Sequence, residues 1–127
     1  MEKLVSYLIE NKLKIATAES CTGGLLASRL TDIPGVSEIF EMGIVSYSNR
    51  IKNEFLGVKS EDLEKYGAVS EAVAKEMSKG AAKKADADIG VGITGIAGPG
   101  GGTEETPVGT VFMGCCCKGK TVTREYH

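Results

Sequence analysis

Apolar residues recur along the chain with two different spacings. Leu4, Val5, Leu8 and Ile9 are separated by one, three or four residues, which places them on one face of a helix over residues 3–11. The same reasoning predicts four further helices, which cover Thr22 to Leu30, residues 49–56, Ser60 to the residue before Gly67, and Ser70 to beyond Ala81. Short runs rich in β-branched or small apolar residues predict strands over residues 14–18, 39–47, 89–94, 108–117 and 121–126.

Small polar residues and glycines mark where these elements begin and end. Ser48 and Ser70 precede predicted helices, and a serine hydroxyl at that position can accept a hydrogen bond from a free backbone N–H. Gly67 is placed to end a helix, because glycine readily adopts the left-handed conformation that follows a last turn. A tight turn is predicted over residues 118–120, and a glycine-rich loop over residues 95–107.

In chain order the predicted elements are α-β-α-β-α-α-α-β-β-β. Helices between the early strands and none between the last three predict an α/β fold, in which a mixed sheet covered by helices ends in a C-terminal antiparallel hairpin. No repeat or linker divides residues 1–127, so one domain is expected. No closing helix is predicted after the last strand. We therefore expect one face of the sheet to be left to a partner or to missing residues.

Composition narrows the partners and the compartment. The 15 basic and 17 acidic residues give a net charge of −2, and Lys and Arg form no cluster of the kind that a nucleic-acid surface usually needs. No apolar run is long enough to cross a bilayer. Residues 1–5 do not begin a secretory signal. We therefore expect a cytoplasmic protein that binds neither nucleic acid nor membrane.

The single histidine is His127, at the chain end, where order is usually lowest. A Ser-His-Asp triad, a Cys-His pair and a histidine-rich zinc site are therefore not expected, and a nucleophile would find its base among Lys, Tyr, Asp or Glu. Cys115, Cys116 and Cys117 are adjacent and lack the spacing of metal or redox pairs. They are expected in a buried strand, with Cys116 on the face opposite the other two.

Two segments fit nucleotide-binding motifs by letter but not by context. Residues 114–121 match the phosphate-binding pattern G-x-x-x-x-G-K-T, yet a strand rather than a helix is predicted after them, so we interpret them as a hairpin turn. Residues 90–95 match G-x-G-x-x-G, but these glycines lie inside a predicted strand and Pro99 follows. We interpret them as small residues that allow close packing of the strand.

Three segments place polar residues at the ends of predicted strands, where ligands gather in open α/β sheets. Ser20 precedes glycines that open a helix, whose amides could stabilise an oxyanion; a simple helix cap is the alternative. Lys52 lies on a helix face that can look back at the strand ends, where desolvation would lower its pKa; a solvated lysine is the alternative. Thr94 precedes glycines that can form anion-binding nests, or only a flexible loop.

Five motifs, taken in order and spacing, resemble one family. They run from Thr17 to Val111 and read T-A-E-S-C-T-G-G, S-Y-S-N-x-x-K, G-A-V-S-E, T-G-I-A-G-P-G-G-G and P-V-G-T-V. They resemble the CinA C-terminal domain, also known as the PncC nicotinamide mononucleotide deamidase family. The resemblance implies hydrolysis of the nicotinamide amide of the mononucleotide, giving nicotinate mononucleotide and ammonia in pyridine nucleotide salvage, without a cofactor or a metal. It also suggests a homo-oligomer.

By matching position, the resemblance makes Ser20 the nucleophile of an amidohydrolase. Lys52, helped by Tyr47, would be the base that takes its proton, and Thr94 would help hold the tetrahedral intermediate or the substrate. Cys21 is the rival nucleophile, because a thiol beside a helix start is intrinsically more reactive.

Further residues of the same motifs are expected to bind the nucleotide substrate. Glu19 is expected to orient Lys52 or a ligand hydroxyl. The expected substrate-binding residues are Glu19, Thr22, Gly23, Gly24, Asn49, Gly95, Gly98, Gly100 and Gly101.

The chain departs from the family pattern at its end. Members continue into an F-x-G-D-R-like segment and a closing helix, whereas this chain stops at Tyr126-His127, so we expect a C-terminally truncated domain. Two other functions stay open. One is a non-catalytic nucleotide-binding or competence-associated assembly module, and the other is a serine amidohydrolase that acts on a different small amide.

Overall fold

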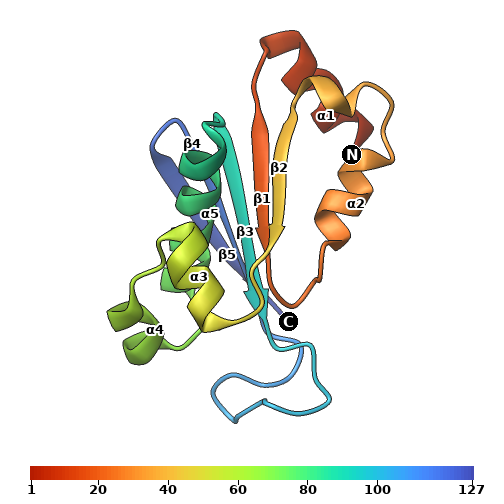
Figure 1. Cartoon of the computed structure of the whole chain (residues 1–127). Helices are drawn as coiled ribbons and strands as arrows, with labels where there is room; N and C mark the ends of the chain where they lie inside the picture. Colours follow the sequence, from red (N-terminus) through yellow and green to blue (C-terminus); the bar gives the residue numbers. More distant parts are fainter.

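Five strands form one sheet that has helices on both faces (Figure 1). The structure is a computed structural model that describes all 127 residues. The strands are β1 (Ile15–Glu19), β2 (Phe40–Val45), β3 (Ile89–Gly95), β4 (Val111–Cys117) and β5 (Lys120–Tyr126). The helices are α1 (Glu2–Asn11), α2 (Leu25–Thr31), α3 (Asn49–Leu56), α4 (Ser60–Tyr66) and α5 (Glu71–Ala85), with a short 3-10 helix at Val36–Glu38.

The strand order is β2-β1-β3-β4-β5, which confirms the predicted mixed sheet. β1 pairs in parallel with both β2 and β3, whereas β3, β4 and β5 pair antiparallel. The C-terminal ends of β1, β2 and β3 therefore meet at one edge of the sheet, and the chain segments that follow these three strands begin side by side.

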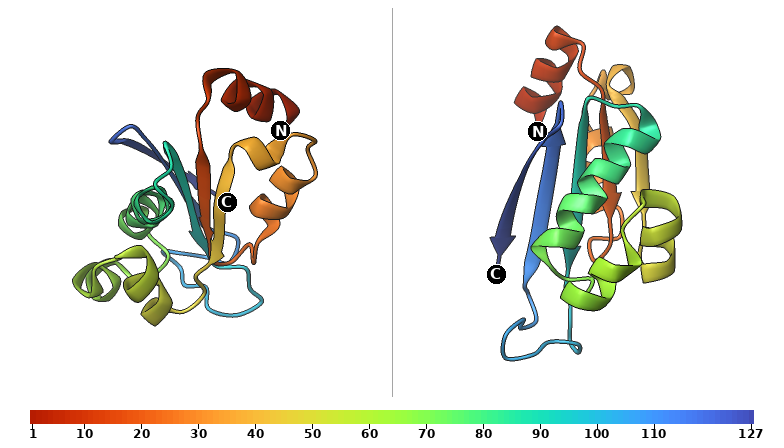
Figure 2. Two further views of the ribbon diagram at one scale, coloured as in Figure 1. Left: turned by 45° about the horizontal axis from the view of Figure 1, so that its top comes forward. Right: turned by 90° about the vertical axis from the view of Figure 1, so that its left-hand side faces the viewer.

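α1 and α2 lie on one face of the sheet and α3, α4 and α5 on the other (Figure 2), and each face carries a hydrophobic core. One joins the sheet to α3, α4 and α5 and contains Ala16, Ala18, Leu56, Val58, Val73, Met77 and Ala81. The other joins it to α1, α2 and the 3-10 helix and contains Val5, Leu8, Ile15, Leu30 and Ile39. Because successive residues of β1 point to alternate faces, this interior strand contributes to both cores.

Small residues let α5 lie directly against β3 and β4. A Cβ atom added to Gly92 or Gly114 would lie 2.6 Å from the Ala74 carbonyl oxygen, and one added to Gly90 would overlap the backbone of α5. The interpretation of the G-x-G-x-x-G segment as packing glycines is therefore confirmed. Cys116 is buried on this face, while Cys115 and Cys117 are half-buried on the other, as predicted.

Residues 114–121, which match the phosphate-binding pattern G-x-x-x-x-G-K-T, form a hairpin, as predicted. Lys118 and Gly119 form the two-residue turn between β4 and β5, with φ angles of 50° and 83°. Both angles are positive, as the favoured turn of a two-residue hairpin requires. No helix follows this turn, so its backbone amides are not arranged to surround a phosphate.

The predicted capping residues are confirmed, and two predicted element starts are wrong. Ser48 accepts a hydrogen bond from the Ile51 amide, and Ser70 accepts one from the Val73 amide. α2 begins at Leu25 rather than at Thr22, because Gly23 and Gly24 take the left-handed conformation. β4 begins three residues after Val108, because residues 107–110 form a turn closed by a Thr110 to Pro107 hydrogen bond.

One face of the sheet carries an open apolar groove beside β4 and β5. Its volume is about 310 Å³, and nine of its twelve lining residues are hydrophobic. Leu4, Leu26, Met113, Val122 and Tyr126 are among them. This groove agrees with the expected incomplete cover on one face. No helix has the length and apolar character needed to span a membrane.

The contact between α5 and β3 predicts a stability effect at Gly92. Gly92→Ala should lower the free energy of unfolding by about 1–3 kcal/mol, because the added methyl group meets the backbone of α5. Gly100→Ala is the matched control, since a Cβ atom there meets nothing within 4 Å, and a change below about 0.5 kcal/mol is expected. Urea unfolding measures both variants. Equal stability of Gly92→Ala and the native protein would contradict the close approach.

Candidate functional site

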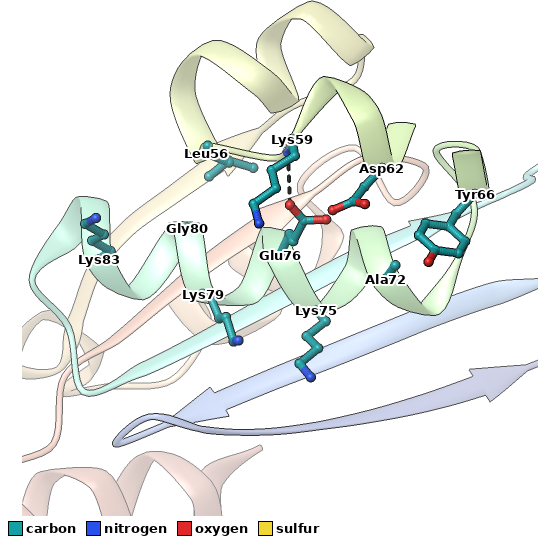
Figure 3. A pocket seen from close by; sticks show the side chains of 11 residues that line it. Leu56, Lys59, Asp62, Tyr66, Ala72, Lys75, Glu76, Lys79, Gly80 and Lys83 are labelled. Carbon is teal, nitrogen blue, oxygen red and sulfur yellow. Dashed lines mark hydrogen bonds between the residues drawn. The ribbon is translucent and has the colours of Figure 1, made fainter. Parts of the chain in front are cut away.

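The largest hollow, about 510 Å³, lies between α4 and α5 (Figure 3). Its lining contains no serine, threonine, cysteine or histidine. The carboxylates of Asp62 and Glu76 lie beside each other, and the amino groups of Lys75 and Lys79 point away from them (Figure 3). Size alone therefore does not identify a site for nucleophilic chemistry here.

The carboxylate in the middle of this hollow attaches α4 to α5. Glu76 accepts a hydrogen bond of 2.9 Å from the backbone amide of Lys59, the residue that precedes α4. Burial raises the pKa of Glu76, and the neighbouring Asp62 raises it further. The polar groups of the hollow thus serve the packing of two helices.

A buried lysine meets a buried serine at the C-terminal edge of the parallel strands. The Lys52 side chain is 1% exposed and Ser20 is 7% exposed. Lys52 Nζ donates hydrogen bonds to Ser20 Oγ at 3.1 Å and to the Tyr47 carbonyl oxygen at 2.9 Å. Lys52 forms no ion pair. The predicted partnership of Ser20 and Lys52 is therefore present as a direct contact.

Burial lowers the pKa of Lys52 below the ordinary lysine value of 10.5. The cause is desolvation, since a charged ammonium group loses its hydration when it is enclosed by protein. A neutral amine can accept a proton, and its neighbour within hydrogen-bond distance is the Ser20 hydroxyl. The pair can therefore act as a nucleophile and its base.

The start of α3 explains why Lys52 points at β1. Ser48 caps the helix, and the Lys52 amide bonds to the Ser48 carbonyl one turn later at 3.0 Å. The helix thus begins immediately after the end of β2, which is the parallel neighbour of β1. A side chain one turn into α3 lies over the end of β1 on the side of the α3–α5 core.

The turn after Ser20 presents backbone amides to the same place. The Ser20 amide bonds to Ile93 on β3, and the Gly23 amide bonds back to Ser20. The amides of Cys21 and Thr22 interact with the Cys21 sulfur, where they lower the pKa of the thiol. Neither amide donates a hydrogen bond to a backbone carbonyl, so both are free to bind an oxyanion that forms beside them at Ser20.

Cys21 is less suited to be the nucleophile than Ser20. Burial raises the pKa of the Cys21 thiol, and this effect outweighs the lowering by the nearby amides and by Lys52. A thiol with a raised pKa has little thiolate at neutral pH. The hydrogen bond of Lys52 goes to Ser20, so the base contacts the hydroxyl and not the sulfur.

The Glu19 side chain binds the turn after Ser20 and the start of α2 rather than Lys52. Its carboxylate accepts hydrogen bonds from the Thr22 hydroxyl at 2.6 Å and from the amides of Leu26 and Ala27 at 2.9 and 3.0 Å. The prediction that Glu19 orients Lys52 is wrong, because Glu19 points to the opposite face of β1. The prediction that the first amides of α2 face Ser20 is also wrong, because Glu19 occupies them. Contact between Glu19 and a substrate stays a prediction.

Thr94 and Tyr47 lie at the site, where the Thr94 hydroxyl binds the backbone and Tyr47 takes part through its carbonyl instead of its ring. Thr94 is buried at the end of β3, next to the end of β1, and its hydroxyl donates to the Ala68 carbonyl at 2.8 Å. The Tyr47 side chain is 72% exposed, and its backbone carbonyl, not its ring, contacts Lys52. Asn49 is exposed at the start of α3 and lines a separate hollow with Arg50 and Asn53.

The predicted substrate-binding glycines fall into two groups. Gly23 and Gly24 belong to the turn after Ser20, with φ angles of 62° and 107°. Gly95 is the last residue of β3, and the β3–β4 connection that follows it leaves the sheet at the same edge and contains Gly98, Gly100 and Gly101 (Figure 1). A Cβ atom on Gly95 would lie 3.0 Å from the Cys21 sulfur, so this glycine permits the connection to approach the Ser20 turn. Contact with a substrate stays a prediction for all six.

Sequence reasoning missed two residues that shape the site. Ser46 is fully buried, and both its amide and its hydroxyl donate to the Glu19 carbonyl, at 2.7 and 3.3 Å. Ala68 supplies the carbonyl that holds Thr94. Ser46 and Ala68 lie in the quoted motifs. Their contacts use the backbone carbonyls of Glu19 and Ala68, and every residue type has a backbone carbonyl, so the sequence does not reveal them. The chain contains no group of three or more His, Cys, Asp or Glu side chains that could hold a metal ion.

Comparison with known proteins identifies relatives of this chain. A family model described as the CinA C-terminal domain matches residues 1–127. A relative from Clostridium acetobutylicum is 61% identical over 124 residues, and one from Acetivibrio thermocellus is 59% identical over 118 residues. Both names contain the words competence-damage inducible protein. The matches cover 98% and 93% of this chain but only 30% and 29% of the relatives, so the chain spans about a third of their length.

Solved structures of the same superfamily share the fold. A competence-damaged protein (CinA) superfamily protein from Escherichia coli superposes with a TM-score of 0.95 at 43% identity, over 99% of this chain and 73% of that one. A competence/damage inducible protein from Agrobacterium tumefaciens gives a TM-score of 0.95 at 42% identity, over 98% of this chain and 76% of that one.

The buried Lys52 predicts a specific dependence of stability on pH. Since the folded-state pKa is lowered, the unfolded chain binds more protons between that pKa and 10.5, and the free energy of unfolding should rise with pH across this window. Lys52→Met should remove that rise, whereas Lys79→Met, on exposed α5 surface, should keep it. Urea unfolding at a series of pH values measures the slope. An unchanged slope in Lys52→Met would show that Lys52 stays charged in the fold.

Proposed function

This chain belongs to the CinA C-terminal domain family, and on that premise we propose that its Ser20 site hydrolyses the carboxamide of nicotinamide mononucleotide. The products are nicotinate mononucleotide and ammonia. The observation that carries the proposal is the 3.1 Å contact between Ser20 Oγ and Lys52 Nζ in a site without a histidine. An amide needs an activated nucleophile and a group that protonates the leaving nitrogen, and one neutral lysine can serve both steps.

The proposed reaction proceeds through an ester of Ser20. Neutral Lys52 takes the Ser20 proton while Oγ attacks the carboxamide carbon, and the developing oxyanion lies at the amides of Cys21 and Thr22. The Lys52 ammonium then protonates the leaving nitrogen, and ammonia departs. A water molecule gives a proton to Lys52 and attacks the ester. Lys52 passes this proton to Ser20 Oγ as the bond to Oγ breaks, and the carboxylic acid product loses its proton to solvent.

The other groups at the site support this cycle through position. The Tyr47 carbonyl accepts a hydrogen bond from Lys52 Nζ and so holds the amino group in both its neutral and its ammonium form. The Thr94 hydroxyl joins the end of β3 to the segment that connects α4 and α5. We further propose a cytoplasmic location and self-association. The alternative function is a non-catalytic nucleotide-binding or competence-associated assembly module, in which the apolar groove would be the contact surface.

Loss of the nucleophile is the first test of the proposal. The native protein should release ammonia from nicotinamide mononucleotide, and Ser20→Ala should lower kcat by about a thousandfold or more. Cys21→Ala should retain kcat within a few fold, because the thiol has no step in the cycle. A coupled ammonia assay measures all three. Nucleotide binding without ammonia release by the native protein would favour the assembly alternative, and full activity of Ser20→Ala would overturn the mechanism.

The pH dependence of kcat/KM is the second test. Only neutral Lys52 can take the Ser20 proton, so kcat/KM should fall as pH decreases through the lowered pKa of Lys52, which lies below 10.5. Lys52→Arg should be inactive at every pH, because a guanidinium group stays charged. Lys79→Arg is the matched control and should follow the native profile. If Lys52→Arg were active and its kcat/KM still fell with decreasing pH, the base would be another group.

A further inference from the structure

Glu19 receives five hydrogen bonds from three different parts of the fold. Its carboxylate accepts from Thr22 and from the amides of Leu26 and Ala27. Its carbonyl accepts from the amide and the hydroxyl of Ser46. The residue is 1% exposed. Both of its side-chain oxygens and its backbone oxygen are therefore committed to the residues around Ser20.

These contacts fix the turn that carries Ser20 at both of its ends. Glu19 directly precedes the turn, and its carbonyl joins the end of β1 to the residue after β2. Its carboxylate reaches forward to Thr22 inside the turn and to α2 beyond it. The Ser20 amide is itself bound to β3. A shift of Ser20 relative to α2 or to β2 would break several of these bonds at once.

The charge of Glu19 has no cationic partner. It forms no ion pair, and its carboxylate is instead held by a hydroxyl and by the free amides at the start of α2. These amides carry the partial positive charge of a helix N-terminus, which favours a carboxylate there. Because Glu19 engages Leu26 and Ala27, these amides are withheld from any oxyanion at Ser20. The donors left to the oxyanion are the amides within the turn.

We propose that Glu19 is a positioning residue of the Ser20 site. It holds the turn so that Ser20 Oγ stays within hydrogen-bond distance of Lys52 Nζ, and so that the amides of Cys21 and Thr22 face the substrate carbonyl. It acts through the turn and forms no hydrogen bond with Lys52. This inference rests on the proposed hydrolytic function of Ser20.

Glu19→Gln tests the inference with little change in size. A glutamine replaces one acceptor oxygen by an NH₂ group, which then faces the donors of α2 or Thr22 and loosens the turn. kcat should fall about 10–100-fold, the cost expected of a small misplacement of a reacting group. KM should change less than about threefold, since the substrate contacts are retained. A purely structural role of Glu19 would leave kcat per folded molecule unchanged.

Glu76→Gln is the matched control. Glu76 also accepts a backbone amide at the start of a helix, but it lies in the α4–α5 hollow and contacts no residue of the Ser20 site. The kcat of this variant should remain at the native value. Thermal unfolding of both variants gives the folded fraction, so that kcat is compared per folded molecule. An equal loss of kcat in both variants would show a general effect of destabilisation and would overturn the positioning role.

A serine-directed fluorophosphonate separates the failure of this inference from the failure of the proposed function. The native protein should be labelled at Ser20, and Glu19→Gln should be labelled at least tenfold more slowly, as measured by mass spectrometry of the Ser20 peptide. A native protein that is not labelled and releases no ammonia would overturn the proposed function. A native protein that reacts in both assays, with Glu19→Gln equal to it, would overturn the positioning role alone.

Thr22→Val keeps the test decisive if Glu19→Gln does not fold. It removes one of the three donors to the carboxylate and leaves Glu19 with its bonds to α2. The labelling rate and kcat should both fall several-fold at unchanged KM. Native values of both quantities in Thr22→Val would contradict a turn held through this contact.

Discussion

The enclosure of Lys52 without a counter-ion is the constraint on which the site depends. A charged ammonium group in that position would lose its hydration and find only a hydroxyl and a carbonyl in return. The fold therefore favours the neutral amine, which is the form that accepts a proton. A carboxylate within ion-pair distance of Lys52 would hold the charge and remove this property. The absence of such a partner is thus as important as the contact with Ser20.

Enclosure of Lys52 requires that the helices on its face lie very close to the sheet. Ala16 and Ala18 on β1 and Gly92 on β3 leave room on that face, and α5 fills it with its backbone almost in contact with the strands. Gly80 on α5 likewise allows the backbone at Leu56, the last residue of α3, to approach. The small residues that resembled a dinucleotide motif therefore have a structural effect on the site. They bring α3, and with it Lys52, down onto the strand ends.

Sequence patterns predicted what depends on residue type and spacing. The helices, the capping serines, the antiparallel hairpin and the pairing of Ser20 with Lys52 all follow from side-chain periodicity, from small polar residues or from a motif resemblance. The contacts of Glu19, the carbonyl of Tyr47 and the start of α2 could not be predicted in that way. Each depends on where a backbone amide or carbonyl points after the chain has turned, and residue type constrains that direction weakly except where glycine allows a positive φ.

The alternation of side chains along β1 explains how one strand end can join both layers of the fold. Glu19 points to the face covered by α2, and Ser20, the next residue, points to the face covered by α3 and α5. The anchor of the turn and the reactive hydroxyl are therefore consecutive residues that never compete for the same donors. The base Lys52 therefore comes from the α3–α5 layer, and the contacts that hold the Ser20 turn come from α2 in the other layer. Ser20 lies where the two layers meet, so its position depends on the packing of both faces of the sheet and not on one loop.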